Sequence, residues 1–367
     1  MPPVPFLDLK EGYLELKPDI DAAVSRVVES GWYILGPEVE EFEKRYAEFC
    51  EAKHCVTVAN GLDALVLSLR ALNIGPGDEV IVPANTFIAT WLAVSAVGAA
   101  PVPVEPDPRT CNIDPALIGA AVTTRTRAII AVHLYGQPAD IDPILAMGQK
   151  HGLAIVEDAA QAHGAVYRNR QIGAHSDAVC WSFYPGKNLG AMGDGGGVTT
   201  NRDDVADRLR VLRNYGSREK YINEVQGPNS RLDPVQAAVL SVKLDHLKKW
   251  NARRRVLARR YLDGLTGVGL PYVPNWADPV WHLFVIRHPK RDQLQSELTE
   301  LGVGTAIHYP VPPHLQQAYA DQGFSKGDFP LSENMAGDML SLPIGPQLTH
   351  ADQDVVIDAV NRIAARI

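Results

Sequence analysis

The sequence predicts an α/β protein in which a mainly parallel, seven-stranded sheet lies between helices and a smaller α+β domain follows at the C-terminus. Between residues 55 and 200, short β-branched runs alternate with stretches of helical periodicity, which is typical of a parallel sheet covered on both faces. After Asn201 the strands cease, and a long helical stretch from about Pro234 to Leu265 leads away from the sheet. The chain of 367 residues also exceeds the size at which one core usually stops growing, which favours two domains.

The first elements are two helices. Pro18 begins a helix whose apolar residues fall on one face and which ends at Gly31, and Pro37 begins a second. Helices are also expected at residues 62–72, at about 86–97 and after Asp140. The seven strands are expected between these helices and after them, at residues 55–59, 79–83, 101–104, 128–132, 153–157, 178–183 and 196–200.

The C-terminal third carries weaker signals. A polar segment, 216–234, shows no periodicity and precedes the long helix. A candidate strand at 282–287, an amphipathic helix near 293–301 and a last helix at 353–364 follow it. We place the domain boundary inside the long helix, so that residues 1–245 form a large domain and residues 246–367 a small one.

Composition excludes several classes of protein. A net charge of −8 and a pI near 5.8 argue against a nucleic-acid binder, which would show a basic face. No segment has the eighteen or more apolar residues of a membrane span, and the start lacks the layout of a signal peptide, so we expect a cytoplasmic protein. The histidines lack metal-ligand spacing, so no metal site is expected. Four cysteines are expected to be free thiols, several of them in the core: Cys50, Cys55, Cys111 and Cys180.

One lysine and one carboxylate define the candidate site. Lys187 follows an apolar strand and lies among six glycines between residues 186 and 197, which would let the backbone approach a bulky ligand. Asp158 ends another strand, and ligands of open parallel sheets bind beyond the carboxyl ends of the strands. An enzyme that holds pyridoxal phosphate (PLP) needs this pair, because the lysine forms a Schiff base and the carboxylate keeps the pyridine nitrogen protonated.

Both residues have an ordinary structural alternative. A lone loop lysine such as Lys187 is often only solvated, and Asp158 could be the N-cap of a helix formed by AAQAH. Glu157, one residue earlier, should project to the opposite face of the strand and is the weaker candidate.

Further residues could complete a cofactor site. The cofactor's phosphate needs backbone N–H groups at the start of a helix, and Gly61 and Leu62 offer them, although Asn-Gly is also a plain turn signal. Ser182 can add a hydroxyl. Phe87, at the next strand end, could stack on the pyridine ring or simply belong to the core.

Seven motifs in this order resemble those of the DegT/DnrJ-like sugar aminotransferases of PLP fold type I: GLDAL, PANTFIAT, HLYGQPAD, EDAAQAHGA, SFYPGKNLGAMGDGG, RNYGSREKY and GPNSRLDPVQAAVL. The resemblance covers practically the whole chain. It implies the same roles for Lys187 and Asp158, and it implies Gln161 near the ring hydroxyl. It also implies that Asn229 reaches the phosphate in the neighbouring subunit, so that the active unit is a homodimer with shared sites. Most family members carry Thr at the position of Leu62, so this chain forgoes one hydroxyl contact.

The C-terminal motifs TAIHYPVPPHLQQAY and LSLPIGP resemble the branch that acts on nucleotide-linked 3-keto-6-deoxyhexoses. This resemblance implies that His308 and Tyr309 face the hexose, while the alternative for HYP is a turn between core elements. Contacts to the sugar or its diphosphate are implied for Tyr184 and, from the partner subunit, for three residues: Arg218, Lys220 and Tyr221.

The implied reaction has two halves. L-Glutamate first converts PLP to pyridoxamine phosphate, which then aminates the keto group of a dTDP-3-keto-6-deoxyhexose, with Lys187 moving the proton. One alternative is a 4-keto-sugar aminotransferase on the same scaffold. Another is a non-catalytic PLP-binding regulatory protein, against which the intact set of Lys187, Asp158 and Gln161 argues.

Overall fold

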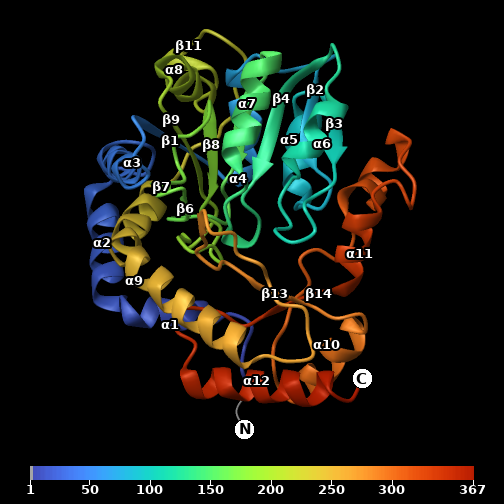
Figure 1. Cartoon of the computed structure of the whole chain (residues 1–367). Helices are drawn as coiled ribbons and strands as arrows, with labels where there is room; N and C mark the ends of the chain where they lie inside the picture. The colour runs from blue at the N-terminus through green and yellow to red at the C-terminus, as the bar shows by residue number, and fades with distance from the viewer. Residues whose placement is uncertain (1–2) are drawn as a thin grey trace.

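A seven-stranded sheet forms one half of the molecule (Figure 1), seen here in a computed structural model that describes residues 3–367. Its strand order is β1-β9-β8-β5-β4-β2-β3. Only β9 runs antiparallel to its neighbours, β1 and β8, and the remaining pairs are parallel. The predicted sheet is therefore confirmed, with strands β1 (His54–Val58), β2 (Glu79–Pro83), β3 (Ala100–Val104), β4 (Thr126–Val132), β5 (Ala154–Asp158), β8 (Ala178–Ser182) and β9 (Gly196–Thr200).

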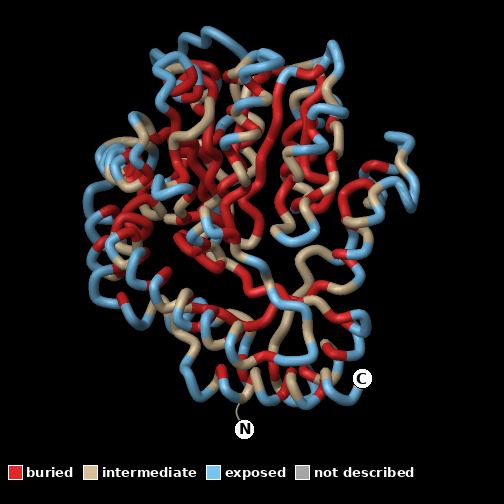
Figure 2. Tube along the Cα trace, viewed as in Figure 1, coloured by how far each residue is buried: buried red, intermediate tan, exposed pale blue. Residues whose placement is uncertain are grey.

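Helices cover both faces of this sheet. Successive residues of β4 alternate between two core clusters, since Ala128 and Ile130 belong to one and Ile129 and Ala131 to the other. The first cluster includes residues from α4 (Gly61–Ala71), α5 (Ile88–Ala96) and α8 (Asp203–Leu212). The second includes residues from α3 (Pro37–Phe49), α6 (Pro115–Ala121) and α7 (Ile141–His151). Because helices cover both faces, the strands are buried along most of their length, as Figure 2 shows, and most of their residues are apolar.

The long helix α9 (Pro234–Gly264) joins the sheet to the C-terminal part, and it ends within one residue of the predicted position. Its first half, with Leu240 and Leu247, packs in a core cluster of the sheet, and its second half, with Leu257 and Tyr261, packs in the C-terminal cluster. A domain boundary near residue 245 stays a prediction. The C-terminal cluster is built from β13 (Phe284–Arg287), β14 (Met339–Leu342), α10 (Arg291–Glu300) and α12 (His350–Ala364).

Several elements carry no sequence signal strong enough to predict them. The polar segment before α9 folds into a hairpin, β10 (Ser217–Glu219) and β11 (Ile222–Asn223), which is too short for a readable pattern. Near the N-terminus, Val4 pairs with Val303 and packs in the C-terminal cluster. The helix expected between Pro18 and Gly31, by contrast, is confirmed as α2 (Lys17–Ser30). The other elements are α1 (Leu9–Glu15), β6 (Val166–Tyr167), β7 (Arg170–Gln171), β12 (Ala277–Asp278), α11 (Pro330–Asp338) and three short 3-10 helices at Leu134–Gly136, Pro313–Leu315 and Gln317–Gln322.

All four cysteines are free thiols, and three of them, Cys50, Cys55 and Cys180, are buried. No helix within residues 3–367 combines the length and the apolar character that a bilayer crossing requires.

Candidate active site

A cavity of about 760 Å³ opens where the parallel strands end, and residues of the C-terminal part form its other wall. Strands β4, β5 and β8 each contribute a terminal residue to the lining, and the loop after β2 contributes Thr86 and Phe87. The cavity therefore lies where an open α/β sheet is expected to bind its ligand. Ten of the fourteen predicted site residues line it: Gly61, Leu62, Phe87, Asp158, Gln161, Ser182, Tyr184, Lys187, His308 and Tyr309.

Lys187 lies in the loop after β8, where its backbone N–H donates to the carbonyl of Tyr184 at 2.8 Å. Burial lowers the pKa of its amine from 10.5 to about 8, although the charge of Asp158 acts in the opposite direction. A lowered pKa leaves part of the amine neutral near pH 7, and only a neutral amine is nucleophilic. Lys187 therefore lies in the cavity lining and not on the open surface of a loop, and its catalytic role stays a prediction.

Asp158 is held in place by two donors. The hydroxyl of Thr90 donates to its Oδ2 at 2.9 Å, and the backbone N–H of Ala160 donates to its Oδ1 at 3.2 Å. Burial raises the pKa of Asp158, while these hydrogen bonds and the charge of Lys187 oppose the rise. Residues 159–163 form turns and not a helix, so the N-cap alternative is wrong. A buried, oriented carboxylate of this kind fits the protonated nitrogen of a pyridine ring.

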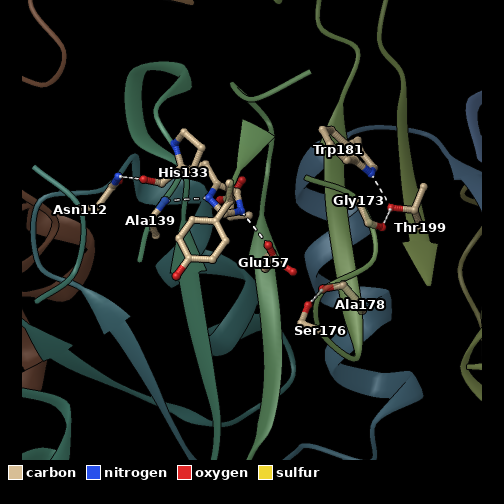
Figure 3. A network of polar contacts seen from close by, with 12 residues as sticks. Asn112, His133, Ala139, Glu157, Gly173, Ser176, Ala178, Trp181 and Thr199 are labelled. Atoms are coloured by element: carbon tan, nitrogen blue, oxygen red, sulfur yellow. Dashed lines mark hydrogen bonds and ion pairs between the residues drawn. The ribbon is translucent and has the colours of Figure 1, made fainter. Parts of the chain in front are cut away.

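Glu157 points away from the cavity, as expected for its place on the strand. Its Oε2 lies 2.9 Å from Nε2 of the buried His133, and Figure 3 shows the pair between neighbouring strands. The backbone N–H of Ala139 donates to Nδ1 of His133, so Nε2 carries the proton and donates to Glu157. Burial alone would raise the pKa of Glu157, but the bond from His133 holds it below 4.5. Glu157 thus has a structural partner and takes no part in the cavity.

The start of α4 provides a cradle for a phosphate. The N–H groups of Gly61 and Leu62 have no acceptor among residues 3–367, as is usual for the first turn of a helix. A Cβ at Gly61 would lie 2.7 Å from the Cβ of Ser182, so only glycine lets the helix start beside that side chain. Two free N–H groups at a helix N-terminus next to a hydroxyl fit the phosphate of PLP.

The glycines around Lys187 have a different role from the one we expected. A Cβ at Gly190 would lie 2.3 Å from the carbonyl oxygen of Pro185, and one at Gly196 would lie 2.2 Å from that of Asn60. These glycines therefore let the loop fold closely on itself and let β9 approach the start of α4. Among the six, Gly186 lines the cavity.

Two aromatic rings and one amide lie together in the cavity lining, those of Phe87, Tyr309 and Gln161. Phe87 is half exposed, and the centre of its ring lies 5.0 Å from that of Tyr309. Gln161 accepts a hydrogen bond from the backbone N–H of Tyr135 at 2.6 Å and donates to the Tyr309 hydroxyl at 3.0 Å. His308 is fixed by a 2.8 Å bond between its Nδ1 and the hydroxyl of Ser341. The alternative of a core phenylalanine is therefore wrong, and a role of HYP in binding the sugar stays a prediction.

Four predicted residues do not line this cavity: Asn229, Arg218, Lys220 and Tyr221. All four are exposed, and Tyr221 is 87% exposed. Arg218 pairs with Asp207 and Glu224 of its own chain. The sequence resemblance assigns Asn229 and the hairpin residues to the site of a partner subunit. Their contacts to the cofactor and the sugar therefore stay a prediction.

Three residues of the site went unrecognised in the sequence: Thr90, His282 and Arg254. The Nδ2 group of Asn188 donates to Oδ1 of Asn251 and to the carbonyl of Val280. Oδ1 of Asn188 therefore accepts a hydrogen bond from the Nδ1–H of His282, 3.1 Å away. Burial lowers the pKa of His282 well below 6.5. His282 is therefore neutral, and its Nε2 can accept a hydrogen bond in the cavity. Thr90 is the last residue of the motif PANTFIAT, but only the structure shows its contact with Asp158, whereas His282 and Arg254 lie in none of the seven motifs.

Comparisons with known proteins identify the family. Residues 15–361 match the model of the DegT/DnrJ/EryC1/StrS aminotransferase family. The chain is 59% identical to the erythromycin biosynthesis sensory transduction protein EryC1 of Saccharopolyspora erythraea, over 96% of this chain and 98% of that protein. It is 56% identical to the dTDP-3-amino-3,4,6-trideoxy-alpha-D-glucose transaminase of Streptomyces venezuelae, over 100% of this chain and 97% of that protein. The chain belongs to this family and is an aminotransferase.

Solved structures agree with this assignment. The crystal structure of Streptomyces venezuelae DesV superimposes with a TM-score of 0.98 at 56% identity, and the match covers 100% of both chains. NtdA of Bacillus subtilis, solved with bound cofactor PMP, matches with a TM-score of 0.92 at 30% identity, over 100% of this chain and 86% of that one. The fold predicted from the sequence, that of a fold-type-I aminotransferase, is confirmed.

Proposed function

We propose that this aminotransferase moves the amino group of L-glutamate to the 3-keto group of a dTDP-linked 6-deoxyhexose, with PLP as its cofactor. The observation that carries the proposal is the shared cavity of Lys187 and Asp158, with the phosphate cradle of α4 in the same wall. The name of the Streptomyces venezuelae relative, a dTDP-3-amino sugar transaminase, supports both the sugar and the position of the new amine.

Each residue of the cavity has a task in this reaction. When bound, PLP supplies an electron sink for the negative charge that develops at the reacting carbon. The N–H groups of Gly61 and Leu62 and the hydroxyl of Ser182 hold the phosphate, and Asp158 holds the proton on the pyridine nitrogen. In the donor half-reaction, Nζ of Lys187 would take the proton from Cα of L-glutamate. In the separate acceptor half-reaction, Nζ would deliver a proton to the former keto carbon of the sugar. A pKa near 8 suits both directions of this transfer.

A homodimer with shared sites is part of the proposal. Asn229 and the β10–β11 hairpin are exposed and lie outside the cavity of their own chain, so a contact to the cofactor or sugar requires a second copy. Three consecutive exposed apolar residues, Trp32, Tyr33 and Ile34, would also be covered by a partner. A cytoplasmic location stays a prediction.

The visible spectrum of the purified protein tests the proposal. We expect the absorbance of lysine-bound PLP to fall when L-glutamate is added and to return when dTDP-3-keto-6-deoxyglucose follows. Lys187→Ala should lack this absorbance. Spectra that stay unchanged with L-glutamate would refute the proposed function.

Two other functions give different results in the same experiment. If only dTDP-4-keto-6-deoxyglucose restores the absorbance, the protein is a 4-keto-sugar aminotransferase on the same scaffold. The name of EryC1 as a sensory transduction protein raises the alternative of a regulator that binds PLP without turnover. The complete set of Lys187, Asp158 and the phosphate cradle favours transamination, and a regulator would show no change with L-glutamate.

A further inference from the structure

Arg254 is a buried cation without an acidic partner. It lies on the second half of α9, is only 4% exposed, and lines the active-site cavity. Its neighbours on the helix behave differently, because Arg253 pairs with Glu15 at 2.8 Å and Arg255 with Asp278 at 2.9 Å. Within residues 3–367, no carboxylate approaches Arg254 to within ion-pair distance.

The contacts that Arg254 does make use one end of its guanidinium group. Nη1 donates to three backbone carbonyls, those of Trp281 at 3.2 Å, His282 at 3.3 Å and Ile344 at 3.0 Å. Nε and Nη2 have no acceptor in the described part of the chain. These two atoms form the edge of the guanidinium that binds a carboxylate through two parallel hydrogen bonds.

The positive charge of Arg254 is buried without an acidic partner among residues 3–367, which costs free energy. Burial lowers the pKa of Arg254 from 12.5 to about 10, and no nearby acid opposes the shift, yet the group stays charged at neutral pH. Burying a charge is costly unless it is paired, and carbonyl oxygens compensate only part of that cost. A ligand with a negative charge would supply the missing partner.

The charges of the cavity wall narrow the choice of ligand. The lining contains two acids, Asp158 and Asp194, and two cations, Lys187 and Arg254. Its histidines do not add charge at neutral pH, because burial lowers the pKa of His308 to about 4 and that of His282 well below 6.5. Since Lys187 is engaged by the cofactor, Arg254 is the cation left in this lining for an anionic substrate.

We propose that Arg254 binds a carboxylate of the amino donor through its Nε and Nη2 atoms. The proposal rests on the proposed function, in which L-glutamate enters this cavity. The cofactor's phosphate has its own donors at the start of α4. The diphosphate of the sugar nucleotide is bulkier, and it carries more negative charge than a single guanidinium group can neutralise. A carboxylate has two oxygens whose spacing fits the Nε and Nη2 donors of one arginine.

The two half-reactions, measured separately, test this role. Arg254→Gln keeps a side chain that can donate to the carbonyls but removes the charge. Arg254→Lys keeps the charge but lacks the two-donor edge. Arg253→Gln, at the neighbouring and partly exposed arginine of α9, is the matched control. In the PLP-loaded enzyme, we expect kcat/KM for L-glutamate to fall on the order of 100-fold in Arg254→Gln and less in Arg254→Lys. In enzyme reconstituted with pyridoxamine phosphate, kcat/KM for the keto sugar should change by less than about threefold.

A binding measurement gives a second readout. Calorimetric titration of the pyridoxamine-phosphate form with 2-oxoglutarate should show affinity weakened on the order of 100-fold in Arg254→Gln and unchanged in Arg253→Gln. Equal losses in both half-reactions, together with unchanged 2-oxoglutarate affinity, would assign Arg254 a purely structural role and overturn the proposal. A loss confined to the sugar half-reaction would also overturn it, because it would assign the arginine to the diphosphate. If the wild type reacts with L-glutamate but with no keto sugar, the proposed sugar substrate fails while the role of Arg254 stands.

Discussion

At the scale of single residues, the burial that makes the amine of Lys187 reactive also destabilises the folded protein. Its pKa of about 8 lies below the 10.5 of an exposed lysine, so folding costs free energy as long as the amine is protonated in both states. The full cost applies below pH 8. It shrinks between pH 8 and 10.5, where Lys187 is deprotonated in the folded state and still protonated in the unfolded state, and it vanishes above pH 10.5. One pKa unit corresponds to about 1.4 kcal/mol, and with allowance for the exposure that Lys187 retains we expect a cost on the order of 2 kcal/mol.

Lys187→Met should therefore stabilise the cofactor-free protein at pH 7 by on the order of 2 kcal/mol, and the gain should diminish toward pH 10. Urea unfolding at several pH values measures both quantities. Lys326→Met, at an exposed loop position, serves as the control and should change little. A gain that does not depend on pH between 7 and 10 would show that the lowered pKa of Lys187 is not its cause.

Thr90 is a second residue whose effect can be isolated. Its hydroxyl orients Asp158 and favours the ionised carboxylate, and a hydrogen bond to a charged group typically contributes about 1.5–3 kcal/mol. Thr90→Val should weaken PLP binding on the order of tenfold or more, whereas Thr90→Ser, which keeps the hydroxyl, should stay within about threefold. A fluorescence titration with PLP measures the difference, and equal affinities for the two variants would refute this role.

At the scale of elements, the phosphate cradle depends on how closely β9 approaches the start of α4. Gly196→Ala would place a Cβ 2.2 Å from the carbonyl oxygen of Asn60, the N-cap of α4. Backbone cannot move aside as a flexible side chain can, so we expect a loss of about 3 kcal/mol in stability and a weaker affinity for PLP.

Gly337→Ala is the matched control for this prediction. Gly337 lies in α11 with nothing within 4 Å of the added Cβ, so alanine should stabilise the helix by about 0.5 kcal/mol. Thermal unfolding of both variants, with and without PLP, compares them. Similar melting temperatures for the two variants would contradict the close approach at Gly196.

The elements also show what could be predicted from the sequence and why. The helix α9 was predicted within one residue because Pro234 marks its start, and the strands because burial on both faces makes them continuously apolar. Asp158 was recognised because it ends such a strand, and Lys187 because it lies among glycines in the loop after another. His282 and Arg254 reach the cavity only through the packing of the C-terminal cluster on the sheet, and a contact between segments so far apart leaves no local pattern.

At the scale of the whole molecule, shared active sites predict complementation between inactive chains. Lys187→Ala removes the amine of its own site, and Asn229→Asp places a negative charge at the phosphate of the other site in the proposed dimer. In a mixed dimer, one site combines the intact Lys187 of one chain with the intact Asn229 of the other. Because half of randomly mixed dimers are mixed and each has one intact site, activity should return to about a quarter of the wild-type value.

Co-expression of the two variant chains, followed by a transamination assay, measures this recovery. Each variant alone should be nearly inactive. If Asn229→Asp alone keeps full activity, or if the co-expressed chains recover nothing, the proposed contribution of Asn229 from the partner subunit is wrong.

The most direct test of the central claim is the position of nitrogen in the product. Incubation with ¹⁵N-labelled L-glutamate and dTDP-3-keto-6-deoxyglucose, followed by NMR of the isolated nucleotide sugar, shows which carbon carries the label. We predict ¹⁵N bonded to C3 of the hexose, with 2-oxoglutarate formed in equal amount. Label at C4 from the 4-keto isomer alone, or no labelled sugar from either isomer, would contradict the account.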